Sequence, residues 1–128
     1  MGTFGKEINS LMKAIDVIRT SSDDMPAQQI QTFLCVALRP GITMEDLGQD
    51  VGISQASVSR NIASLGKWHR LGKPGADYVE AIEDPRERRR KIIYLTHKGR
   101  KVMEKALEAL KGEPVTFESP TAKEAWSR

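Results

Sequence analysis

The sequence predicts a mainly α-helical domain that carries a small antiparallel β-hairpin. Three observations lead to this prediction. Apolar residues recur at helical spacing in several segments, a glycine separates two short helical segments in the middle of the chain, and two strand-like segments flank a dense basic cluster. The chain has 128 residues, of which 39% are hydrophobic, and this size suits one domain with one core.

The first two predicted helices occupy the N-terminal third of the chain. The first spans residues 4–20 and has one apolar stripe among charged and polar positions. This stripe consists of Ile8, Leu11, Met12, Ile15 and Ile18. The second begins near Asp23 and Asp24, which offer a carboxylate cap before Pro26, and ends at Pro40. Its expected core face consists of Ile30, Phe33, Leu34, Ala37 and Leu38.

Residues 43–66 have the spacing of a helix-turn-helix. Thr43 and Asp46 resemble a capping box at the start of a short helix. Gly52 permits a tight turn, and Ser54 offers the N-cap of a second short helix. This order of elements is typical of a DNA-binding helix pair. The residues expected inside the pair are Leu47, Val51, Ile53, Val58, Ile62 and Leu65.

The outer face of the second short helix carries small and hydrogen-bonding side chains instead of the Glu-Lys mixture of an ordinary exposed helix. Small residues let a helix approach the base edges of DNA, glutamine pairs with adenine, and arginine pairs with guanine or binds a phosphate. The alternative is a polar surface helix that its own serines cap. The candidate DNA-binding residues of this segment are Ser54, Gln55, Ser57, Ser59, Arg60 and Ser64.

A β-hairpin is expected over residues 78–95. Residues 78–84 alternate in character, "KIIYLT" is rich in strand-forming residues, and a basic cluster between them forms the expected turn. Placed after a helix-turn-helix, such a hairpin is a β-wing, whose tip reaches the sugar-phosphate backbone or the minor groove. The alternative is a solvated tip, although residues 54–105 carry 13 basic and only 6 acidic side chains. The candidate DNA-binding residues here are Arg86, Arg88, Arg89, Arg90 and Lys91.

The order "ITMEDLGQDVGISQASVSRNIASL" followed by "DPRERRRKIIYLTHKG" closely resembles the MarR family of winged-helix transcription regulators. Members of that family carry a D-P-x-D-R-R wing and then L-T-x-x-G at the start of a long helix. Glu87 stands where the family usually has its second aspartate. The resemblance covers roughly residues 8 to 111. The matching positions of the wing and helix start are Asp84, Pro85, Arg88, Arg89, Leu95, Thr96 and Gly99.

This resemblance implies a homodimer that binds a pseudo-palindromic operator and regulates transcription, as a repressor in our expectation. The first and last long helices of two protomers intertwine in the family, so residues 4–20 and 97–111 would form the dimer contact. The alternative is that both helices pack within one chain. The apolar stripe at 4–20 would meet Val102, Met103, Ala106, Leu107 and Leu110. The resemblance also implies that one wing arginine enters the minor groove and its neighbour pairs with Asp84, for which we expect Arg88 and Arg89 respectively.

The domain expected from this comparison spans residues 1–111, and residues 112–128 form a C-terminal tail. The family generally ends with two helices in the dimer body, whereas Gly112 and Pro114 stop the long helix here and Pro120 interrupts the remainder. Three interpretations of the tail stay open: a disordered segment, a strap across the partner, or a brief helix around residues 121–126.

Several classes of function find no support in the sequence. Cys35, His69 and His97 lack metal-site spacing, and Cys35 is expected to be a buried, inert thiol. The chain has no apolar run near the roughly 20 residues that cross a membrane, and it has no catalytic motif. We therefore expect a cytoplasmic, non-enzymatic protein without a metal or cofactor, whose partners are double-stranded DNA and a second copy of itself, and whose effector, if any, is unknown. An architectural or replication-associated DNA binder and a winged-helix protein-interaction module are the alternative functions.

Overall fold

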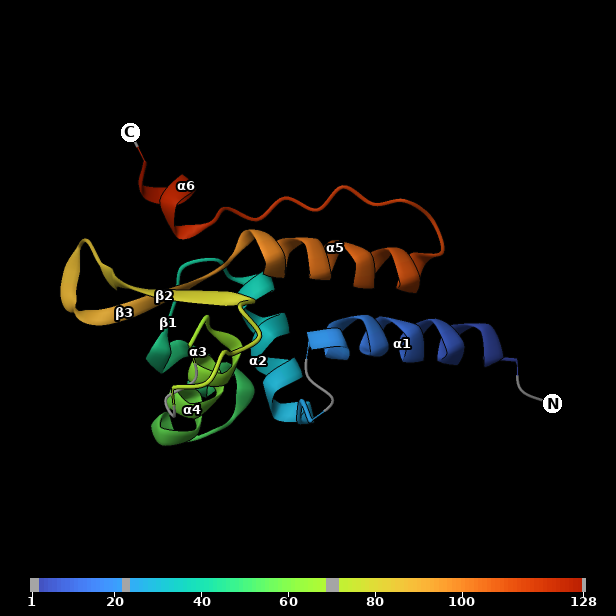
Figure 1. The fold of residues 1–128 in the computed structure, drawn as a ribbon, viewed down its shortest axis with the longest axis horizontal. Helices are drawn as coiled ribbons and strands as arrows, with labels where there is room; N and C mark the ends of the chain where they lie inside the picture. The colour runs from blue at the N-terminus through green and yellow to red at the C-terminus, as the bar shows by residue number, and fades with distance from the viewer. Residues whose placement is uncertain (1–2, 22–23, 69–71, 128) are drawn as a thin grey trace.

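The computed structural model describes residues 3–21, 24–68 and 72–127. Figure 1 shows a helical body from which a β-hairpin projects at one end, with two long helices lying side by side at the other. The helices are α1 (Gly5–Ile18), η1 (Arg19–Ser21), α2 (Ala27–Leu38), α3 (Met44–Val51), α4 (Gln55–Leu65), α5 (His97–Lys111) and α6 (Ala122–Trp126). The strands are β1 (Ile42–Thr43), β2 (Val79–Asp84) and β3 (Glu87–Leu95). None of the described helices is long and apolar enough to cross a membrane.

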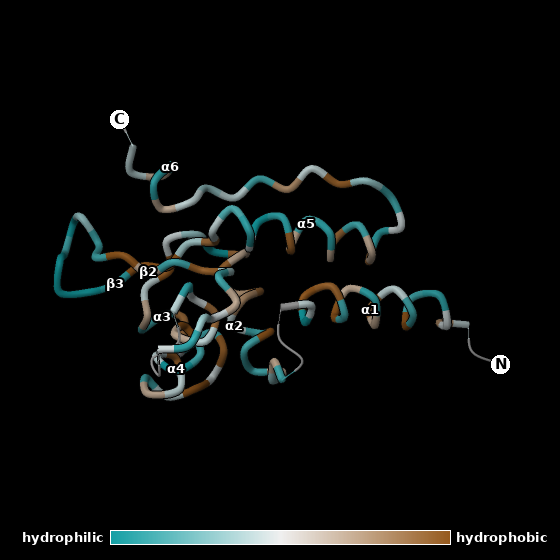
Figure 2. Tube along the Cα trace, in the orientation of Figure 1, coloured by the Kyte–Doolittle hydropathy of each residue, from teal (hydrophilic) through white to brown (hydrophobic). Residues whose placement is uncertain are grey.

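The three strands form one antiparallel sheet in the order β1-β3-β2. The sequence predicted β2 and β3 but missed β1, which is only two residues long and pairs Ile42 with Ile93. Side chains alternate along β3, so Ile93 and Leu95 enter the main core with the helices, whereas Ile92 and Tyr94 lie in a second apolar cluster with Ala122 of α6. The hydropathy pattern of Figure 2 shows the brown apolar stretch of this sheet between the body and the hydrophilic wing tip. Both faces of the sheet are therefore covered at its base.

The helix-turn-helix forms as the sequence predicts. The Thr43 hydroxyl accepts the Asp46 N–H at 3.1 Å and caps α3, although the Asp46 carboxylate does not bond back to the cap. Gly52 adopts φ 79°, in the left-handed region, and ends α3. Ser54 then caps α4 by accepting the Ser57 N–H at 3.2 Å. The inner residues Leu47, Val58, Ile62 and Leu65 are buried.

The start of α5 explains the L-T-x-x-G motif physically. The Thr96 hydroxyl accepts the Gly99 N–H at 3.0 Å and donates to the Asp77 carbonyl at 2.6 Å. A Cβ on Gly99 would lie only 2.0 Å from the Tyr78 carbonyl oxygen, so no larger residue fits at this helix start. The motif therefore joins α5 to the segment that precedes β2.

The second helix differs in two respects from the sequence prediction. Pro26 occupies the N-cap of α2 and no side chain caps the helix, so Asp24 is not the predicted carboxylate cap, and Asp23 lies outside the described residues. The buried face is also rotated: Leu34 and Leu38 are exposed, Leu38 to 81%, whereas Thr32 and Val36 are fully buried. A polar residue can occupy this core position because the Thr32 hydroxyl donates to the Gln28 carbonyl one turn earlier at 2.8 Å.

The helices α1 and α5 pack against each other within the chain and run in opposite directions (Figure 1). Ala14 and Ile18 of α1 are buried, as are Met103 and Ala106 of α5. The intramolecular alternative from the sequence therefore holds for one side of each helix. The rest of the α1 stripe remains uncovered: Ile8, Leu11, Met12 and Ile15 are exposed.

Residues 112–121 run back along α5 as an extended segment and lead into α6 on the wing (Figure 1). Of the three interpretations of the tail that the sequence left open, the structure agrees with the brief helix, which is α6. A full capping box starts it, in which the Thr121 hydroxyl accepts the Glu124 N–H and the Glu124 carboxylate accepts the Thr121 N–H.

Candidate nucleic-acid interface

The exposed face of α4 and the basic part of β3 lie on opposite sides of one open groove. Gln55 and Ser59 line it from α4, and residues 43–46 line it from the start of α3. The basic side is lined by Arg89, Arg90 and Lys91. The fold therefore unites two groups of residues that lie about 30 positions apart in the sequence and that we predicted separately as DNA contacts.

On α4 the predicted outward residues divide into two groups. Ser54, Gln55, Ser59 and Arg60 are exposed, whereas Ser57 and Ser64 are only half-exposed. The Arg60 guanidinium donates to the Ser57 hydroxyl at 3.1 Å, and the Ser54 hydroxyl donates to the same oxygen at 3.1 Å. This short chain of hydrogen bonds holds Arg60 along the outer surface of the helix.

A residue outside the predicted site fixes α4 to the body. Asn61 is buried, and its amide donates to the Gln28 side-chain oxygen of α2 at 3.0 Å. The sequence signal was visible as a polar residue at a position where a generic helix-turn-helix has an apolar one. Its partner, 33 residues away, was not visible. This bond joins α4 to α2 on the same side as Val58, Ile62 and Leu65, which pack α4 into the core and leave Arg60 on the outer face.

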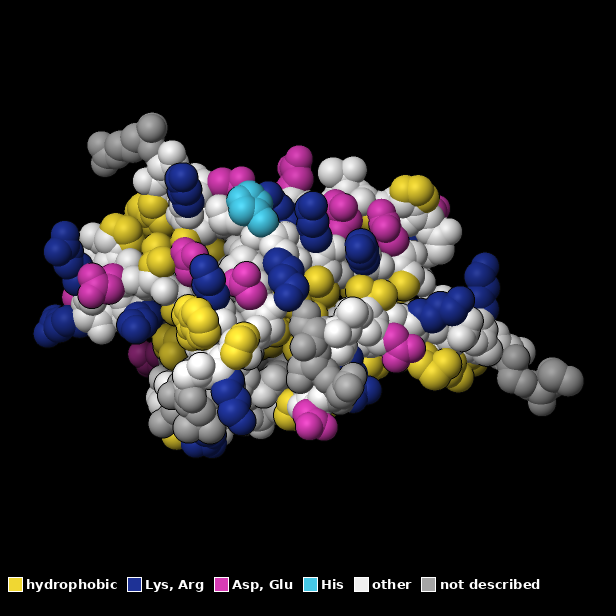
Figure 3. All heavy atoms as spheres, viewed as in Figure 1, with side chains coloured by type: hydrophobic (Ala, Val, Ile, Leu, Met, Phe, Trp, Pro, Cys, Tyr) yellow, Lys and Arg dark blue, Asp and Glu magenta, His cyan; other side chains and the backbone are white. Residues whose placement is uncertain are grey.

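The basic cluster lies mostly along a strand and not in the turn. The turn consists of Pro85 and Arg86, and β3 begins at Glu87, so Arg88 to Lys91 belong to the strand. Lys and Arg side chains surround the projecting end of the hairpin in Figure 3. A strand holds these cations at regular spacing, which a flexible turn would not do.

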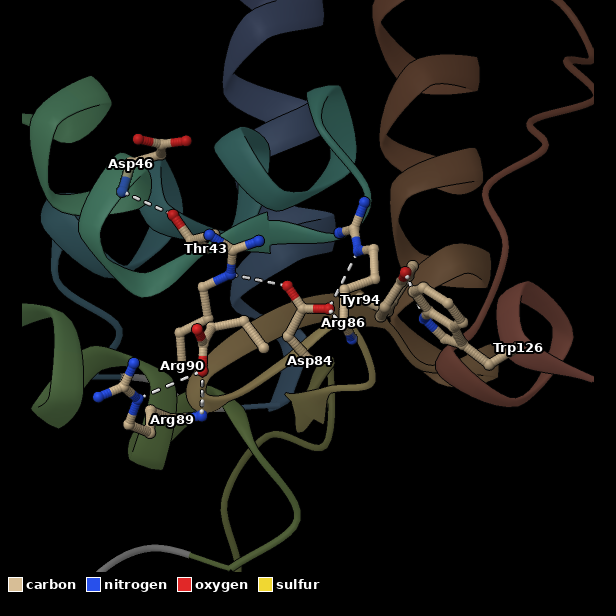
Figure 4. A network of polar contacts seen from close by, with 9 residues as sticks. Thr43, Asp46, Asp84, Arg86, Arg89, Arg90, Tyr94 and Trp126 are labelled. Carbon is tan, nitrogen blue, oxygen red and sulfur yellow. Dashed lines mark hydrogen bonds and ion pairs between the residues drawn. The ribbon is translucent and has the colours of Figure 1, made fainter.

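A buried carboxylate braces the wing. Asp84 has no exposed surface, and its Oδ1 accepts the Arg86 backbone N–H at 2.9 Å and the Arg86 Nε at 3.1 Å. Its Oδ2 accepts the Arg90 Nε at 2.7 Å (Figure 4). The Arg86 backbone hydrogen bond, followed by the Arg90 side chain, lowers the pKa of Asp84 from 3.8 to about 2. The carboxylate is therefore a charged anchor at neutral pH.

The predicted division of the wing arginines was wrong in one part. Arg89 does not pair with Asp84; its Nε donates to Glu87 at 3.3 Å, and its side chain is 90% exposed. The β2–β3 ladder pairs Glu83 with Lys91, and this register brings the next residue of each strand, Asp84 and Arg90, close together before the pairing shifts to Asp84 and Glu87. Arg86 and Arg90 form the brace. The assignment of Arg88 to the minor groove stays a prediction.

Cys35 is buried, as predicted. Burial, followed by the nearby Asp50 carboxylate, raises the pKa of its thiol and keeps it protonated. Arg39 neutralises that carboxylate and also lies 3.4 Å from Asp46, which ties α2 to α3. His69 lies outside the described residues.

The predicted dimer residues fall into three groups. Ile18 and Met103 are buried within the chain and so are not available at its surface. Val102 and Leu107 are half-buried. The exposed group consists of Leu110 of α5 and four residues of α1, Ile8, Leu11, Met12 and Ile15. From here on, the name α1 stripe refers to these four exposed residues.

No protein-family profile and no curated protein matches this sequence. Several solved structures match its fold. The DNA complex of S. aureus MepR matches with a TM-score of 0.64 and 20% identity over 79% of this chain and 75% of MepR. The DNA complex of Streptococcus pneumoniae FabT matches with a TM-score of 0.60 and 20% identity over 82% of this chain and 68% of FabT. MarR itself matches with a TM-score of 0.57 and 19% identity over 80% of this chain and 71% of MarR.

These structural neighbours are MarR-family transcription regulators and not enzymes. The likeness shows that this chain has their fold, a winged helix-turn-helix in which N- and C-terminal helices pack together. The fold class expected from the sequence motifs is thereby confirmed.

Proposed function

We propose that this chain is a sequence-specific DNA-binding transcription regulator. The observation that carries the proposal is the groove in which the exposed face of α4 stands opposite the arginines of a braced wing. A helix with small polar residues suits the major groove, and cations that line the same groove of the protein suit the adjacent phosphates or the minor groove. The fold supports this proposal further, because MepR and FabT of the same fold were solved in complex with DNA.

The positive charge of the wing favours DNA over a protein as its partner. Arg88 and Arg89 are exposed on β3, whereas Arg90 of the same strand and Arg86 of the turn both pair with the Asp84 carboxylate. A surface that no longer met phosphates would gain nothing from additional exposed guanidinium groups beside Lys91. This is our reason for preferring DNA binding to the protein-interaction module.

We infer that the active species is a homodimer on a pseudo-palindromic operator. The α1 stripe and Leu110 leave an apolar surface at the end of the molecule opposite the wing. If the same surface of a second copy packs against it, the two chains form an isologous dimer. The two-fold axis of this dimer would relate the α4 helices of the two chains as a symmetric pair. Repression is the expected sign of regulation, and a protein with this role would act beside the chromosome in the cytoplasm.

The test is a mobility-shift assay of the purified protein with a library of genomic fragments, repeated at several salt concentrations. We expect a few discrete fragments near promoters to bind far more tightly than the rest, with log K falling linearly with log salt. Footprints on these fragments should show two half-sites related by a two-fold axis.

Other results would reject the proposal. Uniform affinity for all fragments would indicate an architectural DNA binder, and the absence of any shift at low salt would indicate a protein-interaction module. Selection of the bound fragments gives the operator sequence and half-site spacing in the same experiment.

A further inference from the structure

The tail, residues 112–127, is bound to α5 in register. Gly112 ends α5 with φ 77°, and the chain then turns back along the helix. The Val115 N–H donates to Glu108 at 3.2 Å and the Phe117 N–H donates to Glu104 at 3.0 Å. The Ser119 carbonyl accepts from Arg100 at 2.9 Å.

These three contacts share one spacing rule. The partners on α5 are four residues apart, which corresponds to about 6 Å along a helix axis. The partners on the tail are two residues apart, which corresponds to about 6.6 Å in an extended chain. Because the two repeats nearly match, one row of charged side chains on α5 can hold the extended segment at three successive points. The row consists of Arg100, Glu104 and Glu108.

At its end the tail reaches the wing. Arg100 also donates to Glu124 at 2.9 Å, which fixes the start of α6. Ala122 is buried against Ile92 and Tyr94 of β3. Trp126 then donates its indole N–H to the Tyr94 hydroxyl at 2.9 Å.

Trp126 also contacts the arginine at the wing turn. The Arg86 guanidinium carbon lies 5.5 Å from the centroid of the Trp126 ring, within the range of a cation–π interaction. Arg86 in turn binds Asp84, which binds Arg90 (Figure 4). One connected series of contacts therefore runs from the tail to the brace of the wing.

We propose that the tail is a positioning element for the wing, and that Trp126 is its positioning residue. By holding Arg86 and Tyr94 from the side away from α4, α6 keeps the hairpin in the orientation that its exposed arginines need. A two-stranded hairpin has little support of its own. Without α6 the hairpin would sample more orientations, and DNA would have to order it at the cost of affinity.

This inference rests on the proposed function, so its test has one readout that needs no DNA. Hydrogen exchange of the β2 and β3 amides is measured in the full chain and in Trp126→Ala, Trp126→Phe and Tyr94→Phe. We expect faster exchange at the wing in Trp126→Ala, with the α3 and α4 amides unchanged. Trp126→Phe keeps a ring beside Arg86 but loses the bond to Tyr94, so it should restore part of the protection. Tyr94→Phe loses that bond and keeps the whole indole beside Arg86, so its wing should be at least as protected as that of Trp126→Phe. Glu118→Gln, an exposed change in the tail upstream of α6, is the matched control.

The second readout is DNA affinity as a function of salt. Trp126→Ala should weaken binding to the selected operator by about two- to fivefold, the size of one exposed cation–π contact, and Trp126→Phe should recover part of this loss.

The outcomes separate the inference from the proposed function. Unchanged wing exchange in both Trp126→Ala and Tyr94→Phe overturns the inference, whether or not the protein binds DNA. Faster wing exchange with unchanged operator affinity also overturns it. If the unmodified protein binds no DNA, the proposed function is wrong. The role of Trp126 in DNA affinity is then wrong too, and hydrogen exchange alone decides whether Trp126 holds the wing.

Discussion

The Nε of Arg90 lies 2.7 Å from the Oδ2 of Asp84, a carboxylate that has no exposed surface. Arg89, the next residue toward the turn, is 90% exposed and contacts only Glu87 among the described ion pairs. Neighbouring arginines on one strand therefore have different roles: Arg90 supports the wing and Arg89 is available to a phosphate.

Substitution of these two arginines should separate the roles. Arg90→Ala should lower the melting temperature, because Asp84 loses a hydrogen-bond partner while it stays buried. Arg89→Ala should leave the melting temperature nearly unchanged and reduce the slope of log K against log salt by about one for each phosphate that a protomer no longer neutralises. Calorimetry and salt-dependent binding assays measure the two effects. Equal effects of both variants on stability would contradict the division.

The stability of the wing should depend on pH in the acid range through Asp84. Its pKa is lowered to about 2 in the folded protein, from 3.8. A carboxylate with a depressed folded pKa contributes stability above its unfolded pKa, and the contribution disappears as pH falls through the folded value. The melting-temperature difference between the unmodified protein and Asp84→Asn should therefore be full above about pH 5 and shrink between about pH 4 and pH 2. A difference that stays constant over that range would show that Asp84 is not the titrating anchor.

The recognition helix should lose specificity when Arg60 is removed. If its guanidinium reads a base, Arg60→Ala should weaken operator binding by about 1–3 kcal/mol and relax the preference at one position of each half-site. Arg60→Lys keeps the charge but not the two-pronged geometry, so it should recover affinity without that preference. Competition assays with single-base operator variants measure both. An equal loss on operator and on random DNA would make Arg60 a phosphate contact.

The bond between buried Asn61 and the exposed Gln28 should contribute to stability. Gln28→Ala leaves the Asn61 amide buried without its partner and should destabilise the protein by about 1–3 kcal/mol. Replacing both residues with leucine removes the unsatisfied group and should cost less than Gln28→Ala alone. Urea unfolding gives the free energies, and Gln31→Ala, an exposed position on the same helix, is the control. A double variant less stable than Gln28→Ala would be inconsistent with this account.

The α1 stripe should control the oligomeric state. Leu11 is exposed in the single chain, so Leu11→Asp should leave the fold intact but bury an unpaired charge in a dimer and produce monomers. Asn9→Asp adds the same charge at another exposed position of α1 and should leave the dimer unchanged. Sedimentation velocity distinguishes the two species. A stable monomer of the unmodified protein at micromolar concentration would refute the homodimer.

The local elements of this fold were predictable because the residues that determine them lie next to one another. Thr43, Ser54 and Thr96 each cap a helix by accepting an N–H three residues ahead, and Gly52 adopts the left-handed conformation that ends α3. The predicted range 97–111 is the observed range of α5. The wing motif in the sequence was sufficient to indicate the winged helix-turn-helix.

The tertiary structure decided the contacts between distant segments. Alternation along a strand states that Arg88 and Arg90 point one way and Arg89 the other, but not which set meets Asp84. The pairing of β2 with β3, in which Glu83 lies opposite Lys91, brings Arg90 to Asp84. Gln28 binds Asn61 across 33 residues, and Trp126 binds Tyr94 across 32. A hydropathy pattern shows that a residue has an apolar or polar environment, whereas only the packed chain brings one particular partner within hydrogen-bonding distance of it.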